Sequence, residues 1–173
     1  MAIKKILTYP NPVLRQKVET VTSFDDSLKQ LAADLAETMY DAPGAGLAAN
    51  QIGVCLRVVV LNVSDSDEEK KHLALVNPEI IEKEGCQVDE EGCLSVIDLT
   101  ANVKRYSKLL VRAQDLDGKS WEFPAEDFFA RVIQHELDHL HGILFIDHLS
   151  PLKRSLYKRR LKKMLRDQEE EST

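Results

Sequence analysis

The segment from Arg131 to Gly142, RVIQHELDHLHG, constrains the fold most, because its spacing places two histidines on the apolar face of one helix. Pro124, Glu126 and Asp127 suit the amino terminus of that helix and Gly142 suits its end, which predicts a helix of about four turns. The helical repeat gives two neighbouring stripes, which consist of Phe128, Val132, His135 and His139 and of Phe129, Ile133, Glu136 and Leu140. Both histidines and Glu136 therefore extend a face that we expect to be buried.

The two histidines are candidate metal ligands. A single His on such a face is more often a core residue satisfied by hydrogen bonds. His135 and His139, however, can place both imidazoles on one cation at about 2.0 to 2.1 Å. With Glu136 between them they form the signature of zinc hydrolases, in which the glutamate is the base. Asp138 falls outside both stripes, so we expect it to orient a ligand or join a local hydrogen-bond network.

Two ligands are too few, because catalytic sites usually supply three protein ligands and a water. Downstream, His141 lies on the opposite side of the helix and cannot share the metal, whereas His148 lies beyond the helix and can. Upstream, Cys93 in EEGCLSV follows a glycine that would allow the backbone to come close to a ligand. Cys93 could equally be a small buried thiol at a strand end. The residues themselves leave the third ligand open.

A second glycine-rich segment, GAGLAANQIG, occupies residues 44–53. Three glycines and three alanines in ten residues offer little side chain for packing, so we expect this backbone to lie close to something else. Gln51 and Asn50 are its side chains that can donate hydrogen bonds. A tight loop between a helix and a strand is the alternative interpretation.

GAGLAANQIG, EGCLS and QHELDHL, in this order, resemble the three motifs of the peptide deformylase family, which removes the formyl group from the amino terminus of new bacterial or organellar proteins. The resemblance runs from TYPNPVLRQKV near the start to DHLSPLK near the end. It implies an α+β fold with mixed or antiparallel sheets wrapped around the helix that carries the HExxH motif. The alternatives are a zincin-like metallopeptidase and a related domain kept for ribosome binding or as a structural module.

The resemblance also implies the roles of the site residues. The metal ligands would be Cys93, His135 and His139, with a water as the fourth. A metal-activated water would attack the formyl carbon with Glu136 as general acid/base, while Gln51 and the Leu94 N–H hold the carbonyl oxygen. We expect further substrate contacts at Gly44, Ala45, Gly46, Glu91 and Val132. The metal that the resemblance implies is Fe(II) in the cell, with zinc, nickel or cobalt as replacements.

The chain departs from the family pattern after EGCLSV. The common pattern continues with a proline and, a little further on, a glycine or arginine. This chain has Ile97, Asp98, Leu99 and Thr100 instead. These positions follow the ligand loop directly, so we expect the difference to affect the edge of the substrate cleft.

The rest of the chain predicts helices, then strands, then helices, which is typical of an α+β domain. Asn11 and Pro12 predict a short helix that continues through Val13, Leu14 and Val18, and Asp25 to Ser27 cap a second one that continues to about Pro43. The predicted strands are LRVVVLNV (residues 56–63), HLALVNPEIIEKEG and KRYSKLLVRAQDLDGKSWEF, the last of which turns at Asp117-Gly118. A final helix should begin at about Ser150.

The length and the charge distribution of the chain predict its domain organisation, partners and location. At 173 residues we expect one domain, with the catalytic part in residues 1–148 and a basic helix with an acidic tail in residues 149–173. The net charge is −6, but eight basic residues and no acid lie between Lys153 and Arg166, so the rest carries 15 basic and 29 acidic residues, or −14. This basic helix could bind ribosomal RNA. We expect no DNA or membrane partner and a cytoplasmic location, with Cys55, Cys86 and Cys93 as free thiols.

Overall fold

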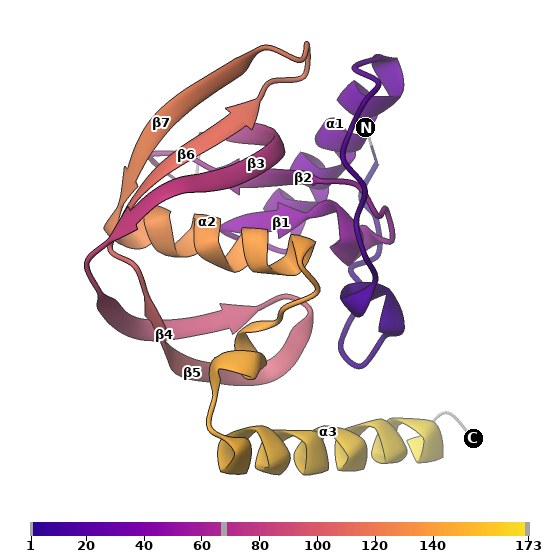
Figure 1. Ribbon diagram of the computed structural model, residues 1–173. Coiled ribbons are helices and arrows are strands. Elements are labelled where there is room, and N and C mark those ends of the chain that lie inside the picture. The colour runs from indigo at the N-terminus through magenta and orange to yellow at the C-terminus, as the bar shows by residue number, and fades with distance from the viewer. Residues whose placement is uncertain (1, 67–68, 172–173) are drawn as a thin grey trace.

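Two antiparallel β-sheets lie on opposite sides of a central helix in the computed structural model, which describes residues 2–66 and 69–171 (Figure 1). The larger sheet has the order β1-β2-β3-β6-β7 and consists of β1 (Gly46–Ala48), β2 (Val58–Asn62), β3 (His72–Glu84), β6 (Lys108–Gln114) and β7 (Ser120–Glu126). The smaller sheet pairs β4 (Gln87–Cys93) with β5 (Val96–Arg105). The helices are α1 (Asp26–Asp41), α2 (Asp127–Leu140) and α3 (Pro151–Glu171), with short 3-10 turns η1 (Pro12–Arg15), η2 (Ala49–Ile52) and η3 (Phe145–His148). The predicted α+β class is confirmed.

Two helices differ from the prediction, the first at its carboxyl end and α2 at its amino end. η1 begins after Asn11, whose side chain caps the Val13 N–H as expected, but the chain is already extended at Gln16. Pro124 does not begin α2, because it lies in β7 opposite Leu110 and the helix starts at Asp127. A proline is tolerated there since β7 is an edge strand, where a missing N–H costs no bond in the ladder.

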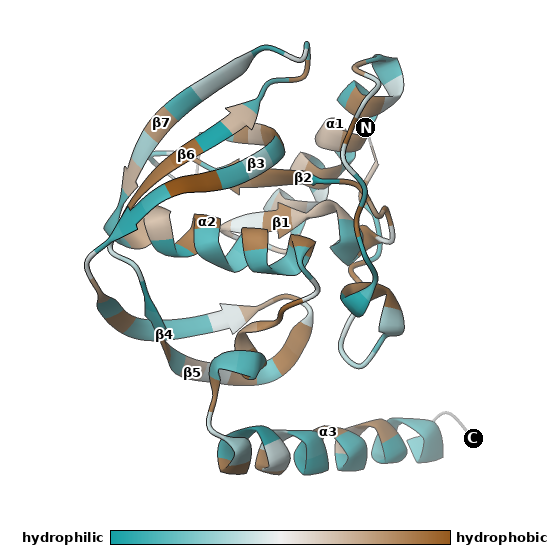
Figure 2. Ribbon diagram, viewed as in Figure 1, coloured by the Kyte–Doolittle hydropathy of each residue, from teal (hydrophilic) through white to brown (hydrophobic). Residues whose placement is uncertain are grey.

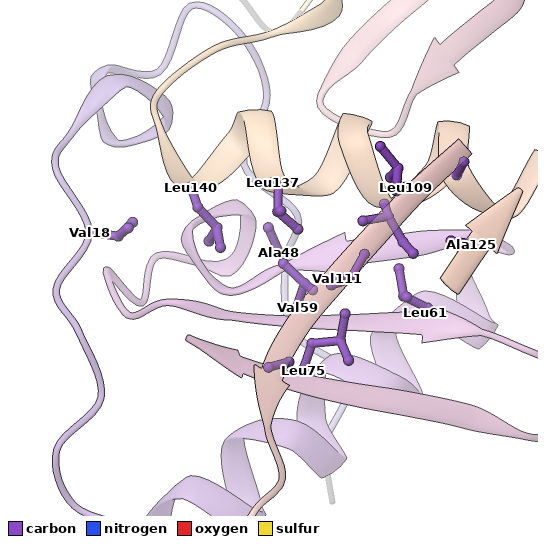
Figure 3. Packing of buried hydrophobic residues seen from close by; sticks show 13 residues of the cluster. Val18, Ala48, Val59, Leu61, Leu75, Leu109, Val111, Ala125, Leu137 and Leu140 are labelled. Carbon is purple, nitrogen blue, oxygen red and sulfur yellow. The ribbon is translucent and has the colours of Figure 1, made fainter. Parts of the chain in front are cut away.

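The apolar run in β2 is buried on both faces of the larger sheet. Val58 and Val60 face α1, where they pack with Leu35 and Met39, whereas Val59 and Leu61 face α2. Figure 3 shows the second of these cores, in which Leu137 and Leu140 of α2 point toward the strands. The opposite side of α2 is thereby left to face the smaller sheet.

A third core joins the smaller sheet to the carboxyl-terminal part of the chain. Val96 and Val103 of β5 pack with Phe145 of η3 and with Tyr157 and Leu161 of α3. The rest of α3 is mostly hydrophilic, apart from the exposed Leu152, Leu156 and Leu165, and runs along the outside of the body (Figure 2). Residues 172 and 173 of the predicted acidic tail lie outside the described residues. Among the helices of the described ranges, none is both long and apolar enough to cross a membrane.

Candidate metal centre and substrate cavity

Three side chains from two elements converge between the sheets. His135 and His139 project from α2, and Cys93 is the last residue of β4. The Sγ of Cys93 lies 3.4 Å from Nε2 of His139, and one ligand atom from each of the three residues lies within 4.8 Å of the others. Of the candidates that the sequence left open for the third position, the structure brings Cys93 to the two histidines.

His148 and His141 lie elsewhere. The Nε2 of His148 is 2.9 Å from an oxygen of Asp138, so its imidazole contacts this carboxylate and not the three candidate ligands. His141 caps the end of α2 and is exposed, as its position opposite the ligands predicted. The downstream ligand that a zincin-like peptidase needs is therefore not supplied by either residue.

The donor set fits a divalent transition metal. A thiolate and two imidazoles are ligands that zinc, iron, cobalt and nickel accept. Burial holds the pKa of His139 well below its usual value, so its imidazole is neutral, which is the form that binds metal. Burial also opposes charge on His135, but hydrogen bonds with Cys93 and Glu91 outweigh it and raise its pKa to about 10. A bound cation would take the place of the proton that Nε2 of His135 otherwise carries.

Glu91 holds His135 from the side away from Cys93. Its Oε1 accepts a hydrogen bond from Nδ1 of His135 at 2.9 Å, which leaves Nε2 for a metal. Arg105 donates to both carboxylate oxygens at 2.8 Å, and Arg131 donates to Oε2 at 2.5 Å. Burial alone would raise the pKa of Glu91, but the bonds from Arg105 and His135 lower it to about 2. Glu91 is thus an ionised carboxylate whose oxygens are fully engaged.

Asp138 continues this network, as its position off the two stripes predicted. Its Oδ2 accepts from Nη1 of Arg105 at 2.6 Å and lies next to His148. Arg105 and Arg131 were not singled out from the sequence. The available signal was the arginine at position 131 inside an otherwise apolar helical segment, because a buried arginine needs an acidic partner.

Glu136 is buried and close to the three candidate ligands. Its side chain is 5% exposed, and its Oε1 lies 3.8 Å from Nε2 of His135. Burial raises its pKa to about 7, against a lowering effect of His135. Glycine is required at position 46, opposite Glu136, because a Cβ on Gly46 would come within 2.8 Å of Cγ of Glu136. The glycine-rich segment therefore approaches the glutamate directly, and part of it forms β1 instead of a loop.

Gln51 is oriented toward the same point. Its Oε1 accepts the Ala48 N–H at 2.9 Å, so its Nε2 faces Oγ of Ser95 at 3.0 Å and Sγ of Cys93 at 3.9 Å. Leu94 and Ser95 form the turn between the paired residues Cys93 and Val96, so the Leu94 N–H is outside the ladder of the hairpin. Ser95 is a buried neighbour of the site that the sequence analysis missed.

A cavity of about 530 Å³ opens onto these residues. Its lining includes every residue predicted as a substrate contact, namely Gly44, Ala45, Gly46, Glu91 and Val132, together with Gln51, Cys93, Leu94, His135 and Glu136. His139, which is fully buried, lies behind them. Asp98, Leu99 and Thr100 also line the cavity, so the segment that departs from the family pattern borders it as expected.

The segment from Ile97 to Leu99 forms a bulge in β5. Gly92 pairs with Thr100 and Cys93 with Val96, so the three residues between have no partner on β4, and Asp98 has a φ of 56°. Helix α3 holds this bulge, because the Tyr157 hydroxyl donates to the Ile97 carbonyl oxygen at 2.9 Å and Arg160 donates to that of Asp98. The rim of the cavity thus depends on a helix that is distant in the sequence.

Comparisons with known proteins agree with this geometry. The profile of the family described as polypeptide deformylase matches residues 3–155. A peptide deformylase of Desulfotalea psychrophila is 57% identical over 164 residues, which cover 94% of this chain and 97% of the relative. The crystal structure of a peptide deformylase from Legionella pneumophila superposes with a TM-score of 0.88 at 46% identity, covering 96% and 98% of the two chains. One from Thermotoga maritima gives a TM-score of 0.81 at 39% identity, covering 87% and 100%. With a Cys-His-His cluster beside the cavity and matches over nearly its whole length, the chain belongs to the peptide deformylase family, the enzymes that remove the N-formyl group from nascent proteins.

Proposed function

We propose that the chain deformylates formyl-methionyl peptides with Cys93, His135 and His139 as its metal ligands. The observation that carries this proposal is the convergence of the three ligand atoms within 4.8 Å beside a cavity that Cys93 and His135 line and that can admit a peptide end. A divalent metal bound there supplies Lewis acidity, which brings the pKa of water toward neutrality and polarises the formyl carbonyl.

Glu136 moves the proton in this proposal. A carboxyl group with a pKa of about 7 can accept a proton from the attacking water and deliver it to the departing amine at neutral pH. Its position beside His135 and against Gly46 places it at the cavity wall, where substrate would lie. The products are formate and a free amino terminus.

Gln51 and the Leu94 N–H stabilise the formyl oxygen as negative charge develops on it. The amide of Gln51 is fixed through Ala48, so its Nε2 needs no reorganisation during the reaction. The Leu94 N–H, in the turn between Cys93 and Val96, is available for a second hydrogen bond. Gly44, Ala45, Gly46 and Val132 would bind the substrate, whereas Glu91 would act through His135.

The metal is proposed to be Fe(II) in the cell, with zinc, nickel or cobalt as replacements, because the ligand set accepts all four. The exposed basic residues of α3, between Lys153 and Arg166, are proposed to contact ribosomal RNA, since their charge contrasts with the acidic body. An enzyme that contacts ribosomes in this way would be located in the cytoplasm, which is the location we propose. Residues 1–148 would form the catalytic part, and residues 149–173 an extension of the same domain.

The test is formate release from formyl-Met-Ala-Ser by protein that is purified without oxygen, with the metal measured in the same sample. We expect turnover in proportion to bound metal. Cys93→Ala should lose both metal and turnover, whereas His148→Ala should keep the metal. Loss of metal in His148→Ala with retention in Cys93→Ala would contradict the proposed ligand set.

A further inference from the structure

A second cavity, of about 910 Å³, lies between the two sheets on another face of α2. Gln134, Leu137 and Asp138 line it from α2, whereas the second half of β3 and the end of β5 line it from the larger and the smaller sheet (Figure 1). Within the described part of the chain, no residue lines both this cavity and the substrate cavity. The proposed deformylation therefore gives the second cavity no role.

The two cavities differ in charge. Among the described residues, four acids and one arginine line the substrate cavity, whereas four lysines or arginines, two histidines and two acids line the second cavity. This excess of basic residues contrasts with the whole chain, whose net charge is −6. Because a cavity lined by one sign of charge focuses the field, the second cavity attracts anions.

Both acids that the structure describes in the second cavity are already paired with arginines. Oε1 of Glu79 lies 3.2 Å from Nη1 of Arg112, and Oδ2 of Asp138 lies 2.6 Å from Nη1 of Arg105. Arg105 also donates to both oxygens of Glu91 at 2.8 Å, so it contributes charge to the cavity but its N–H groups are engaged. An anion in the cavity would therefore meet little repulsion from these carboxylates.

The other three cations of this cavity have no carboxylate within ion-pair distance among the residues that the structure describes. Nη2 of the half-buried Arg57 donates to the Pro78 carbonyl oxygen at 2.6 Å, which holds the guanidinium in place. Nζ of Lys83 lies 5.0 Å from the ring centroid of Tyr106, and Lys104 is exposed near the end of β5. These side chains offer charged hydrogen-bond donors to an anionic ligand.

The rest of the lining favours a ligand that combines phosphate with an aromatic ring. Ile80 and Leu137 are apolar, and Tyr106 is 43% exposed. Lysine and arginine bind phosphate through charged hydrogen bonds, and nucleic-acid bases stack on exposed aromatic rings. A nucleotide carries both groups. A carboxylate side chain of a peptide brings one charge, so it would engage one of the three cations and leave the others unpaired.

We propose that this cavity binds a nucleotide, with Arg57, Lys83 and Lys104 as contacts of the phosphate groups and Tyr106 against the base. The chemistry is the same for a free nucleoside diphosphate and for a nucleotide within RNA. His148 lines the cavity and precedes the start of α3 by three residues, so an RNA strand that contacts the basic helix would pass near the opening. Nucleotide binding is separate from the metal centre and from deformylation.

Calorimetric titration of the metal-loaded protein with ADP tests the site. The double variant Lys83→Gln, Lys104→Gln should bind ADP about 10- to 100-fold more weakly than the wild type, because charged hydrogen bonds to phosphate are lost. Adenosine, which has the base but no phosphate, should bind at least about tenfold more weakly than ADP for the same reason.

The matched control is the double variant Lys17→Gln, Lys119→Gln. It removes the same charge from two exposed lysines that do not line the cavity, so it should keep the wild-type affinity for ADP. Lys83 and Lys104 are exposed as well, so we expect both double variants to unfold at the wild-type urea concentration. ADP bound at the catalytic metal would be insensitive to both.

Hexauridylate distinguishes the two sources of the nucleotide. Tighter binding of hexauridylate than of ADP, with loss in the Lys83 and Lys104 variant, assigns the cavity to RNA, whereas tighter binding of ADP assigns it to a free nucleotide.

Absence of binding of both ligands to the wild type overturns the inference, and so does equal affinity in the wild type and the Lys83 and Lys104 variant. Tighter binding of a glutamate-rich peptide than of either nucleotide ligand would also overturn it. Formate release plays no part in these measurements, so their failure leaves the proposed function untouched.

Discussion

Glu91 accepts a hydrogen bond from Nδ1 of His135 at 2.9 Å, and the same carboxylate forms ion pairs with two buried arginines, Arg105 and Arg131. Glu91→Gln should therefore affect both the metal and the fold. We expect metal affinity to fall by about 10- to 100-fold because the orientation of His135 is lost. The free energy of unfolding should fall by about 3 to 5 kcal/mol, since Arg105 and Arg131 lose their shared countercharge. Competition with a chelator and urea unfolding measure the two effects.

The control for this variant is Glu79→Gln. Glu79 pairs with Arg112 at 3.2 Å on the exposed surface, so its loss should change stability by less than about 1 kcal/mol and leave the metal unaffected. If Glu91→Gln bound metal as tightly as the wild type, Glu91 would have no part in orienting His135.

Glu136→Gln should separate metal binding from chemistry. Glutamine has nearly the same shape as Glu136 but cannot carry a proton between water and amine. We expect kcat to fall by roughly 10²- to 10⁴-fold, the usual contribution of a positioned acid/base, with unchanged metal content. Formate release and metal analysis on one sample provide the measurement. Turnover near the wild-type rate in a metal-loaded variant would exclude the proton-transfer role.

Tyr157→Phe tests whether α3 shapes the cavity rim. The variant removes the hydroxyl that donates to the Ile97 carbonyl oxygen, a bond worth about 1 kcal/mol, but keeps the ring in its core. We expect KM for a formylated tripeptide to rise by about 2- to 5-fold while kcat changes little. Tyr106→Phe, on an exposed tyrosine, is the control. Identical KM values for both variants would mean that the bulge keeps its shape without α3.

The ion pair between Arg15 and Asp147 predicts a pH dependence of stability. Burial alone would raise the pKa of Asp147, but the hydrogen bonds from Arg15, at 2.5 Å, and from the Leu144 N–H outweigh it and lower that pKa. The stabilisation is therefore present above the unfolded-state pKa of 3.8 and disappears as the pH falls through the lower folded-state value.

Asp147→Asn should accordingly lose about 1 kcal/mol of unfolding free energy at pH 7, a modest value because both side chains are partly exposed. The difference from the wild type should shrink as the pH falls below 3.8. Urea unfolding of both proteins at several pH values measures it. A constant difference across this range would assign the effect to packing and not to charge.

Reversal of the charges on α3 tests the ribosome proposal. Lys158, Arg159 and Lys162 are exposed, and changing all three to Glu should weaken salt-sensitive co-sedimentation with ribosomes by at least about tenfold. Activity on formyl-Met-Ala-Ser should stay within about twofold of the wild type, since Tyr157 and Leu161 remain. Deletion of the whole helix would not serve, because it removes these two core residues.

A matched control reverses three exposed lysines on the body, Lys17, Lys108 and Lys119. The same change in net charge should then leave co-sedimentation nearly intact. Equal weakening by both triple variants would attribute ribosome binding to net charge alone, and no weakening by either would remove α3 from the interaction.

The sequence predicted the central helix and its ligands well, because the i, i+4 spacing of His135 and His139 is a local property of one helix. Cys93 joined them only through the family resemblance, since β4 brings it to α2 by long-range pairing that no local pattern encodes. The smaller sheet was missed because its strands are polar and partly exposed, as the alternation in β5 shows. Pro124 misled the prediction, because a proline near acids resembles a helix start whether or not an edge strand precedes it.

The metal ligands are shared between layers that otherwise have separate cores. Cys93 belongs to the smaller sheet, whose apolar residues pack with η3 and α3, whereas the histidines belong to the helix that packs on the larger sheet. A cation held by all three would therefore cross-link the two halves of the molecule. Oxidation of one sulfur atom would then remove this cross-link and leave the two halves joined by the buried ion pairs of Glu91 and Arg105, so the protein would open more easily and be more exposed to proteases.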